Sequence, residues 1–342
     1  MKIGVTFGSS TNFPAMLDEI AGYDAAGVDA IWLGESYGFD AIGPLGALSQ
    51  ITSRALLGPG IVSAYSRTPT LLAQSALTLD ALSGGRAILG LGASGPAVIE
   101  GWHGVPYERP VARMAAIIDI CRRVWAREVA TGSPPYPLPV NSRRALKVMA
   151  TGPRTKIPIY IAALGAASVR MTARKADGWT SVMFWPERAD GVWGSALREG
   201  LSRRGDDLAA LQIVAPAHVA IDTEHADRHW DALRAHTAHY VGGMGPRGQN
   251  FYHDVLSRYG LGTAADRVAD LYLNKQREQA AAAVPQEYLE GVALIGSREH
   301  VRQRLQAYAD AGVSMLNVTL AGSTSEERIA QLRLVRELAD GL

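Results

Sequence analysis

The sequence predicts an α/β protein, a (β/α)₈ TIM barrel with insertions at the C-terminal face. Strand-like and helix-like segments alternate from the first residues onward. The strands are short and apolar, which is typical of a parallel sheet buried on both faces. Eight such units follow one another without a Pro-, Gly- or Ser-rich linker. Because a barrel of this kind takes about 250 residues and often more, residues 1–342 are expected to form a single domain.

Eight strands are expected where short apolar runs stand between turn residues. Near the end of the third, two glycines flank Pro59, which indicates an unusual backbone conformation such as a bulge. Val292 to Ile295 is interpreted only as a short apolar run. The expected strands are Ile3 to Phe7, Asp29 to Leu33, Leu56 to Val62, Ala87 to Leu91, Pro158 to Ala163, Trp179 to Phe184, a stretch within Leu211 to Ile221, and Met315 to Leu320.

Helices are expected where apolar residues recur at intervals of three and four. Ser66 and Thr68 are suitable caps beside Pro69, because a hydroxyl oxygen can accept from the first free N–H groups of a helix. The expected helices are Phe13 to Ala26, about Ile42 to Ile51, Pro69 to Leu82, Pro110 to Val129, about Ala167 to Ala176, His300 to Ala311 and Glu326 to Leu338, with further helical sequence after Phe184.

Two regions interrupt this alternation. Residues 127–156 are rich in Pro, Ser and Arg, whereas residues 224–286 are polar and helical, with the run Gly242-Gly243-Met244-Gly245-Pro246 in their middle. We expect both to be insertion segments near the barrel mouth rather than separate domains. In that position both would line the substrate site.

Composition excludes several classes of function. The formal net charge is +1, which gives no electrostatic case for nucleic acid or an anionic membrane as a partner. No apolar run reaches the 18 or so residues that a membrane span needs. Cys121 is the only cysteine, and its helical context favours a buried structural thiol. The N-terminus is interpreted as a first strand and not as a signal peptide, so a cytoplasmic location is expected.

Gly90, Gly92 and Gly95 match G-x-G-x-x-G, the dinucleotide fingerprint. A true fingerprint lies after the first strand of a βαβ unit and opens a helix directly, but this one follows the fourth strand and precedes an expected loop. The glycines then have one of two roles. Either they allow close packing, or Gly92-Ala93-Ser94-Gly95 ends a barrel strand at the catalytic face, where small residues let a flat ring lie against the backbone.

Residues that follow the other strands are further candidates, because these loops form the site of a barrel enzyme. Glu35 and Ser36 follow the second strand, and Glu35 is either a proton acceptor or a satisfied structural acid. Ala162 to Ser168 follow the fifth strand and open a helix, so their free N–H groups favour an anion. Trp102, His103 and Tyr107 lie in the fourth loop and are expected to wall a pocket.

No metal site is predicted. His225, His229 and His236 fall on one helical face, but no carboxylate or cysteine joins them at a recognisable spacing, and a solvated face is the better interpretation. No G-x-S-x-G, Walker, H-E-x-x-H or C-x-x-C motif occurs.

The run from Leu82 to Gly92, containing Leu82-Ser83-Gly84-Gly85-Arg86 and Leu89-Gly90-Leu91-Gly92, resembles the luciferase-like monooxygenase superfamily. Gly95 to Gly104, Gly58 to Ile61 and Gly242 to Gly245 are similar to its branch that uses the deazaflavin coenzyme F-420. The resemblance covers nearly the whole chain. It implies a (β/α)₈ barrel, hydride transfer at C5 of a reduced deazaflavin, a small-molecule substrate and a homodimer.

The resemblance also implies positions for the cofactor. A non-prolyl cis peptide after strand three supports the ring, and the matching bond is Gly60-Ile61, with Ser63 close behind. The positions that contact the ring after strand four match Gly92, Ala93 and Ser94. The phosphate-binding loop after strand five matches Ala163, Gly165, Ala166 and Ala167.

Two departures affect the expected chemistry. Several members have an Asp-His pair after strand two, and Glu35-Ser36 stand here; sugar-phosphate dehydrogenases of the family have a glutamate where Gly95 stands. That substrate class is therefore disfavoured. We expect a hydride to reach an electron-poor C=C, C=N or C=O group, with Glu35 supplying a proton through Ser36 or a water. Tyr65 and His103 are further candidate donors.

Two alternatives remain from the sequence. One is an FMN-dependent monooxygenase of the same superfamily, which predicts FMN binding and oxygen consumption. The other is a protein that holds deazaflavin or flavin without turnover, which would be compatible with the missing His and Glu catalysts.

Overall fold

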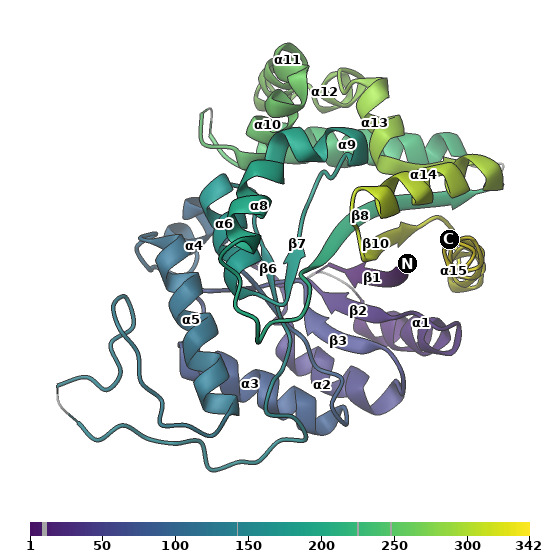
Figure 1. The fold of residues 1–342 in the computed structure, drawn as a ribbon. Coiled ribbons are helices and arrows are strands. Elements are labelled where there is room, and N and C mark those ends of the chain that lie inside the picture. The colour runs from purple at the N-terminus through teal and green to yellow at the C-terminus, as the bar shows by residue number, and fades with distance from the viewer. Residues whose placement is uncertain (9–11, 142, 224–225, 247) are drawn as a thin grey trace.

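The computed structural model describes residues 1–342 except 9–11, 142, 224–225 and 247, and it confirms the predicted barrel fold (Figure 1). All strand pairs are parallel, and the order β3-β2-β1-β10-β8-β7-β6-β5-β4 runs around the barrel. The strands are β1 (Lys2–Phe7), β2 (Ala30–Leu33), β3 (Leu56–Pro59), β4 (Val62–Ser63), β5 (Leu89–Gly92), β6 (Ile159–Ala162), β7 (Gly178–Thr180), β8 (Gln212–Ile221), β9 (Ala293–Gly296) and β10 (Met315–Leu320).

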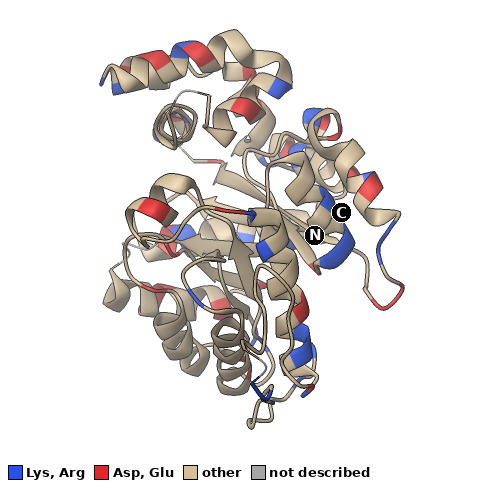
Figure 2. Cartoon of the chain, turned by 90° about the vertical axis from the view of Figure 1, so that its left-hand side faces the viewer, with Lys and Arg blue, Asp and Glu red and all other residues tan. Residues whose placement is uncertain are grey.

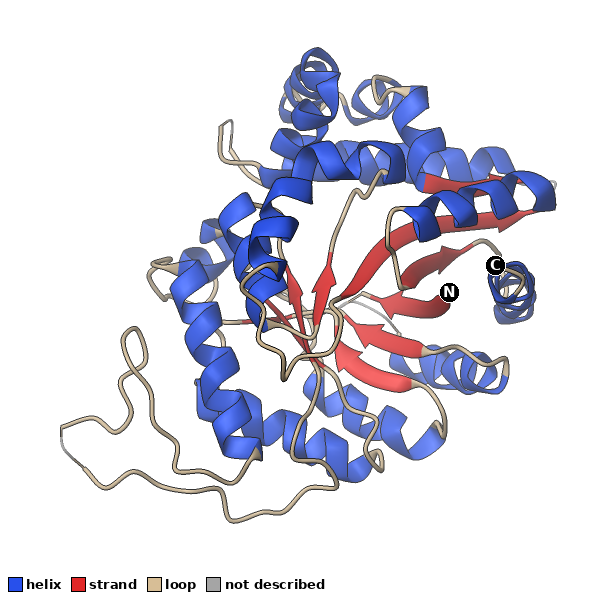
Figure 3. Ribbon diagram, viewed as in Figure 1, coloured by secondary structure: helices blue, strands red, loops and turns tan. Residues whose placement is uncertain are grey.

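Helices surround the strands on the outside (Figure 3). Helix α3 begins as the sequence predicts, with the Thr68 side chain accepting a hydrogen bond from the N–H of Leu71, and the structure adds a capping box of Thr324 and Glu327 at α15. The helices are α1 (Phe13–Ala25), α2 (Ile42–Ile51), α3 (Pro69–Leu82), α4 (Pro96–Gly101), α5 (Pro110–Trp125), α6 (Ala166–Lys175), α7 (Pro186–Ala189), η1 (Asp190–Gly194), α8 (Ser195–Leu201), α9 (Ala226–Gly243), α10 (Phe251–Leu256), η2 (Ser257–Leu261), α11 (Gly262–Leu273), α12 (Arg277–Ala282), α13 (Gln286–Val292), α14 (Arg298–Asp310) and α15 (Ser325–Asp340).

The third predicted strand is interrupted. It forms β3 and β4, which are separated by a cis peptide bond between Gly60 and Ile61. The ring therefore has nine strands but eight barrel positions, because β3 and β4 together occupy one position. A bridge between Leu57 and Ala87 joins the two ends of the ring, with Leu57 accepting from the N–H of Ile88 at 2.8 Å.

Three other expectations need correction. The apolar run Val292 to Ile295 forms a strand, β9, which pairs with the last residues of β8 beyond the point where β7 ends. The long helix expected to reach Val129 ends at Trp125. The expected loop after Gly95 begins with the short helix α4, so the glycine run does open a helix. The argument against a dinucleotide fingerprint is then that the run follows the fourth barrel strand and not the first.

The barrel interior accounts for the glycines of β5. Its core is a cluster of Ala30, Trp32, Ile88, Tyr160, Val214 and Met315, which is separate from the larger core between the barrel and the helices. A Cβ on Gly90 would overlap the carbonyl oxygen of Pro59, and one on Gly58 would lie 2.8 Å from the carbonyl oxygen of Ile88. Of the two roles expected for the glycine run, close packing therefore applies to Gly90.

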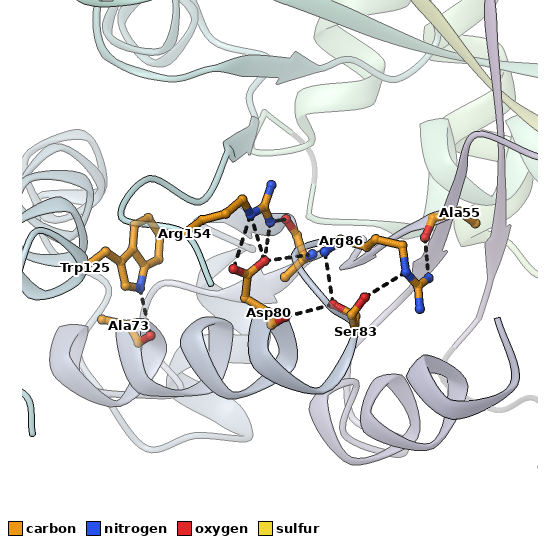
Figure 4. A network of polar contacts seen from close by, with 8 residues as sticks. Ala55, Ala73, Asp80, Ser83, Arg86, Trp125 and Arg154 are labelled. Carbon is orange, nitrogen blue, oxygen red and sulfur yellow. Dashed lines mark hydrogen bonds and ion pairs between the residues drawn. The ribbon is translucent and has the colours of Figure 1, made fainter. Parts of the chain in front are cut away.

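The turn Ser83 to Arg86 connects the end of α3 to the start of β5, so it lies at the opposite end of the barrel from the loops that follow the strands, and Figure 4 shows its polar contacts. Arg86 donates to the carbonyl oxygens of Ala55 at 2.7 Å and Thr52 at 2.8 Å, and Gly84 and Gly85 have φ of 65° and 90°. Arg154 pairs with Asp80, which is fully buried. This turn therefore ties α2, α3 and the loop before β6 to the start of β5.

Replacing Arg86 by alanine is expected to lower the free energy of unfolding by about 2 kcal/mol, because several partly buried carbonyl oxygens lose their donor. Urea unfolding measures the change. Arg302→Ala, which removes an exposed pair with Glu299, is the control and should cost less than about 0.5 kcal/mol. Equal losses in the two variants would contradict the structural role.

The two insertions leave the barrel at different ends. Residues 224–286 follow β8 and contain α9 to α12, so they lie at the predicted C-terminal face. Residues 127–156 connect the end of α5 to the start of β6, which corrects their predicted origin: they leave from the other end of the barrel (Figure 3). Their turn at Tyr136 nevertheless reaches the site side, where the hydroxyl donates to the carbonyl oxygen of Ala64 at 3.0 Å.

Charged residues of both signs are interspersed over the outer helices (Figure 2). Among the described residues, the structure contains no helix with the length and apolarity that crossing a membrane requires.

Candidate functional site

Small residues from three adjacent strands form one continuous surface at the C-terminal end of the barrel. Ser63 in β4 pairs with Gly92 in β5, and Gly92 pairs with Ala162 in β6. The predicted cofactor residues follow these positions directly, so the structure brings them together in the order that the sequence suggests. Ile61 lies against Gly92, and Ala93 and Ser94 follow Gly92 directly in the chain.

The cis bond expected from the resemblance is present at Gly60-Ile61. A Cβ on Gly60 would lie 2.9 Å from Cβ of Trp32, and one on Gly92 would lie 2.7 Å from Cδ1 of Ile61. Ile61 therefore covers Gly92 closely, and Gly60 packs against the start of the Trp32 side chain. The result is a wall of backbone and one branched side chain.

Ser94 has a φ of 58°, which is uncommon for a residue other than glycine. Its carbonyl oxygen accepts from the hydroxyl of Tyr107 at 3.2 Å. Tyr107 in turn stacks on Tyr65, with ring centroids 5.3 Å apart. The fourth loop is thus fastened to the end of β5 by an aromatic pair, which the sequence predicted only as a pocket wall.

Tyr65 does not have the geometry of a proton donor to substrate. Its ring is buried, and its hydroxyl donates to the carbonyl oxygen of Glu108 at 2.9 Å. Burial raises the pKa of Tyr65 to about 12, and the guanidinium of Arg113 lies 4.9 Å from the ring centroid. These contacts indicate a structural role.

Glu35 forms a two-point ion pair with Arg67. The two oxygens accept from Nη1 at 2.6 Å and from Nη2 at 2.8 Å, and Oε2 also accepts from the N–H of Ala41. The Glu35 carboxylate raises the pKa of Arg67 above its ordinary value. Both carboxylate oxygens are therefore engaged. This favours the interpretation of Glu35 as a structural acid over its interpretation as a proton acceptor. Ser36 beside it is exposed.

The residues predicted to form the phosphate loop are held by two tryptophans. The indole N–H of Trp179 donates to the carbonyl oxygen of Ala163, and that of Trp193 donates to the carbonyl oxygen of Leu164, each at 2.9 Å. Helix α6 begins directly afterwards at Ala166, and no side chain caps it. Gly165, Ala166 and Ala167 are exposed, so the free N–H groups of the first turn face solvent.

Two large aromatic side chains are exposed beside this surface. Tyr37 follows β2 and is 67% exposed, Trp102 follows α4 and is 63% exposed, and their ring centroids are 6.5 Å apart. Predicted His103, which follows Trp102, is half-buried. Exposed rings of this size next to a strip of small residues are typical of a site that receives a flat, partly apolar ligand.

The sequence missed a histidine pair on the other side of the mouth. His218 in β8 and His236 in α9 have ring centroids 5.7 Å apart, and His236 also contacts Tyr240 at 4.5 Å. His236 is exposed, which agrees with the solvated face predicted for α9, although its ring lies beside that of His218, and His225 lies outside the described residues. Within the described ranges, no cluster of His, Cys, Asp or Glu suits a metal ion.

Acid is expected to destabilise the protein through His218. Burial, with His236 and His229 nearby, lowers its pKa from 6.5 to about 4. Between these values the unfolded chain binds the proton more readily, so the free energy of unfolding falls as the pH drops through this window, by about 2 kcal/mol.

Urea unfolding at about pH 7 and about pH 4.5 measures this loss. The His218→Gln variant should lose less stability over the same interval, because its side chain does not titrate. An equal loss in both proteins would contradict the assignment to His218.

Comparison with known proteins places the chain among enzymes. Residues 2–315 match the luciferase-like monooxygenase family. The chain is 37% identical, over 96% of its own length and 97% of the relative's, to a Mycobacterium tuberculosis protein named as a coenzyme F-420-dependent oxidoreductase. It is 26% identical to the 5,10-methylenetetrahydromethanopterin reductase of Archaeoglobus fulgidus, over 94% of this chain and 93% of that one. The coenzyme F-420-dependent tetrahydromethanopterin reductase of Methanopyrus kandleri has the same fold, with a TM-score of 0.82 at 22% identity over 99% of this chain and 98% of that one.

Proposed function

Because this chain belongs to the luciferase-like monooxygenase family, we propose that it is an F-420-dependent oxidoreductase that reduces an electron-poor C=C, C=N or C=O bond of a small organic substrate. The observation that carries this proposal is the continuous surface of small residues from Ser63 through Gly92 to Ala162. It places a flat wall next to the uncapped start of α6. A ring that ends in a phosphate-bearing chain matches both features.

The residues present fit the deazaflavin cofactor in two ways. The ring would lie against Ile61 and Gly92, where a Cβ on the glycine would collide with its neighbour. The phosphate would bind the free N–H groups at Gly165, Ala166 and Ala167, helped by the positive end of the helix. When bound in its reduced form, F-420 supplies the hydride, which is chemistry that no side chain provides.

The chain's own residues would bind and orient the cofactor and the substrate, and they would exclude water from the site. The Trp179 and Trp193 indoles hold the Ala163-Leu164 carbonyl groups inward, so the N–H groups that follow are already oriented toward an anion. Glu35, expected from the sequence as the proton source, is proposed here as a positioning residue that holds Arg67. Ser36 and the half-buried His103 remain proposed polar contacts of the substrate.

Fluorescence titration of F-420 with the purified protein tests this proposal. Saturable quenching or a spectral shift, with a dissociation constant in the micromolar range or below, is the expected result. Binding of FMN without any effect on F-420, together with oxygen consumption in the presence of reduced FMN, would replace the proposal by a flavin monooxygenase. Binding of F-420 together with a closed space beside its ring would favour a carrier.

A further inference from the structure

His218 faces the inside of the barrel at its C-terminal mouth. Residues two and four positions apart on a strand share a face, and Val214, four positions earlier, belongs to the interior cluster with Trp32 and Tyr160. On one edge His218 pairs with Thr319 of β10, and on the other edge with Ala293 of β9. The backbone of His218 is therefore held on both sides, which fixes the direction of its side chain.

Helix α9 covers this histidine with rings. His236 lies beside it, Tyr240 packs on His236, and Tyr252 of α10 meets Tyr240 edge to face with centroids 4.7 Å apart. We call His218, His236, Tyr240 and Tyr252 the mouth cluster. It contains no Lys, Arg, Asp or Glu. His239, on the same helix, meets the Tyr240 ring edge to face with centroids 5.7 Å apart and bonds to the hydroxyl of Tyr272 at 2.7 Å.

The mouth cluster is polar but uncharged. Burial and the neighbouring imidazoles lower the pKa of His218 to about 4, so its ring is neutral near pH 7. Within the described part of the chain, neither ring nitrogen of His218 is engaged in a hydrogen bond. A neutral imidazole carries one N–H donor and no charge with which to attract an anion.

We propose that His218 is a catalytic residue that donates a hydrogen bond to the carbonyl oxygen of an uncharged α,β-unsaturated substrate, and that the mouth cluster selects substrates without a charged group. This inference rests on the proposed function, since the hydride comes from a reduced deazaflavin. Hydrogen-bond donors aimed at an oxygen that gains charge in the transition state lower the barrier to reaction.

The electrons and atoms balance for such a substrate. The hydride adds to the β-carbon, and the C=C electron pair moves to form an enolate whose oxygen accepts from the His218 N–H. Water at the open mouth then supplies the proton that adds to the α-carbon. The product is the saturated carbonyl compound, the deazaflavin is left oxidised, and His218 ends the cycle neutral.

The test uses 4-(dimethylamino)cinnamaldehyde, an uncharged enal whose absorption moves to longer wavelength when its carbonyl oxygen accepts a hydrogen bond. Binding to the full-length protein, alone and with oxidised F-420, is followed by this shift without turnover. We expect the shift in the wild type, its loss in His218→Ala and a partial return in His218→Asn. The control is His300→Ala, on α14 and outside the mouth cluster, which should behave as the wild type.

Kinetics with the same enal and reduced F-420 provide the second measurement. His218→Ala is expected to lower kcat about 100-fold, while the dissociation constant of F-420 stays within about twofold, which shows that the variant is folded and that the cofactor site is intact. The 4-carboxy analogue, which carries a charge, should bind at least about tenfold more weakly, because no cation of the mouth cluster compensates the buried carboxylate.

An unchanged absorption shift in His218→Ala, no shift in the wild type, or equal binding of the charged analogue would each overturn the inference. Failure of the proposed function gives a different result: no binding of F-420 by the wild type, while the enal shift in the protein alone still reports on His218.

Discussion

Gly90→Ala is expected to lower the free energy of unfolding by at least about 3 kcal/mol. The added methyl group would overlap the carbonyl oxygen of Pro59, which is backbone and cannot turn away as a side chain can. Either β3 and β5 must separate, or the variant must bury a strained contact beside Trp32. Separation would also open the bridge between Leu57 and Ala87 that closes the barrel.

Urea unfolding measures this effect, and Gly46→Ala is its matched control. Gly46 lies inside α2, and an added Cβ would be 3.8 Å from the nearest atom, on Leu82. Alanine is the better helix former there, so the control should gain up to about 1 kcal/mol. If Gly90→Ala were as stable as the wild type, the packing role of this glycine would be wrong.

Gly165→Asp is expected to separate stability from cofactor binding. Gly165 is the N-cap residue of α6 and makes no side-chain cap, so an aspartate there should stabilise the helix by a few tenths of a kcal/mol. The same carboxylate would occupy the N–H groups proposed to hold the phosphate and would repel its charge. We expect the affinity for F-420 to fall about 100-fold, which is about 2.7 kcal/mol.

Thermal unfolding and fluorescence titration of the same preparation provide the two measurements. Gly165→Asn is the control for charge, because it caps the helix without repelling an anion and should lose less affinity. Were Gly165→Asp to bind F-420 as tightly as the wild type, the phosphate would have to be placed elsewhere on the barrel.

Local patterns in the sequence were sufficient for the architecture. Each strand is a short apolar run, and some helices also carry a start signal, such as Thr68 before Pro69, so neighbouring residues largely determine the alternation. The cis bond at Gly60-Ile61 was predicted from the resemblance and is present. The irregularity near Pro59 was also expected, whereas the added strand β9 was not predicted, because it depends on pairing with the distant strand β8.

The candidate site was likewise predictable from the sequence only in part. The small-residue loops at Gly92 and Gly165 could be found in the sequence because each follows its own strand. The partners of Glu35 and His218 could not be found: Glu35 pairs with Arg67 across 32 positions, and His236 reaches His218 only because α9 folds back over the barrel.

The sequence by itself determined that this chain is a barrel with small residues at the ends of adjacent strands, because burial on both faces of a strand and helix capping are encoded by nearby residues. Only the tertiary structure decided why Gly90 must be glycine, which groups Glu35 satisfies and which histidine faces the mouth. Those answers depend on strand register and on the closure of the ring, which bring together atoms whose separation along the chain carries no local signal.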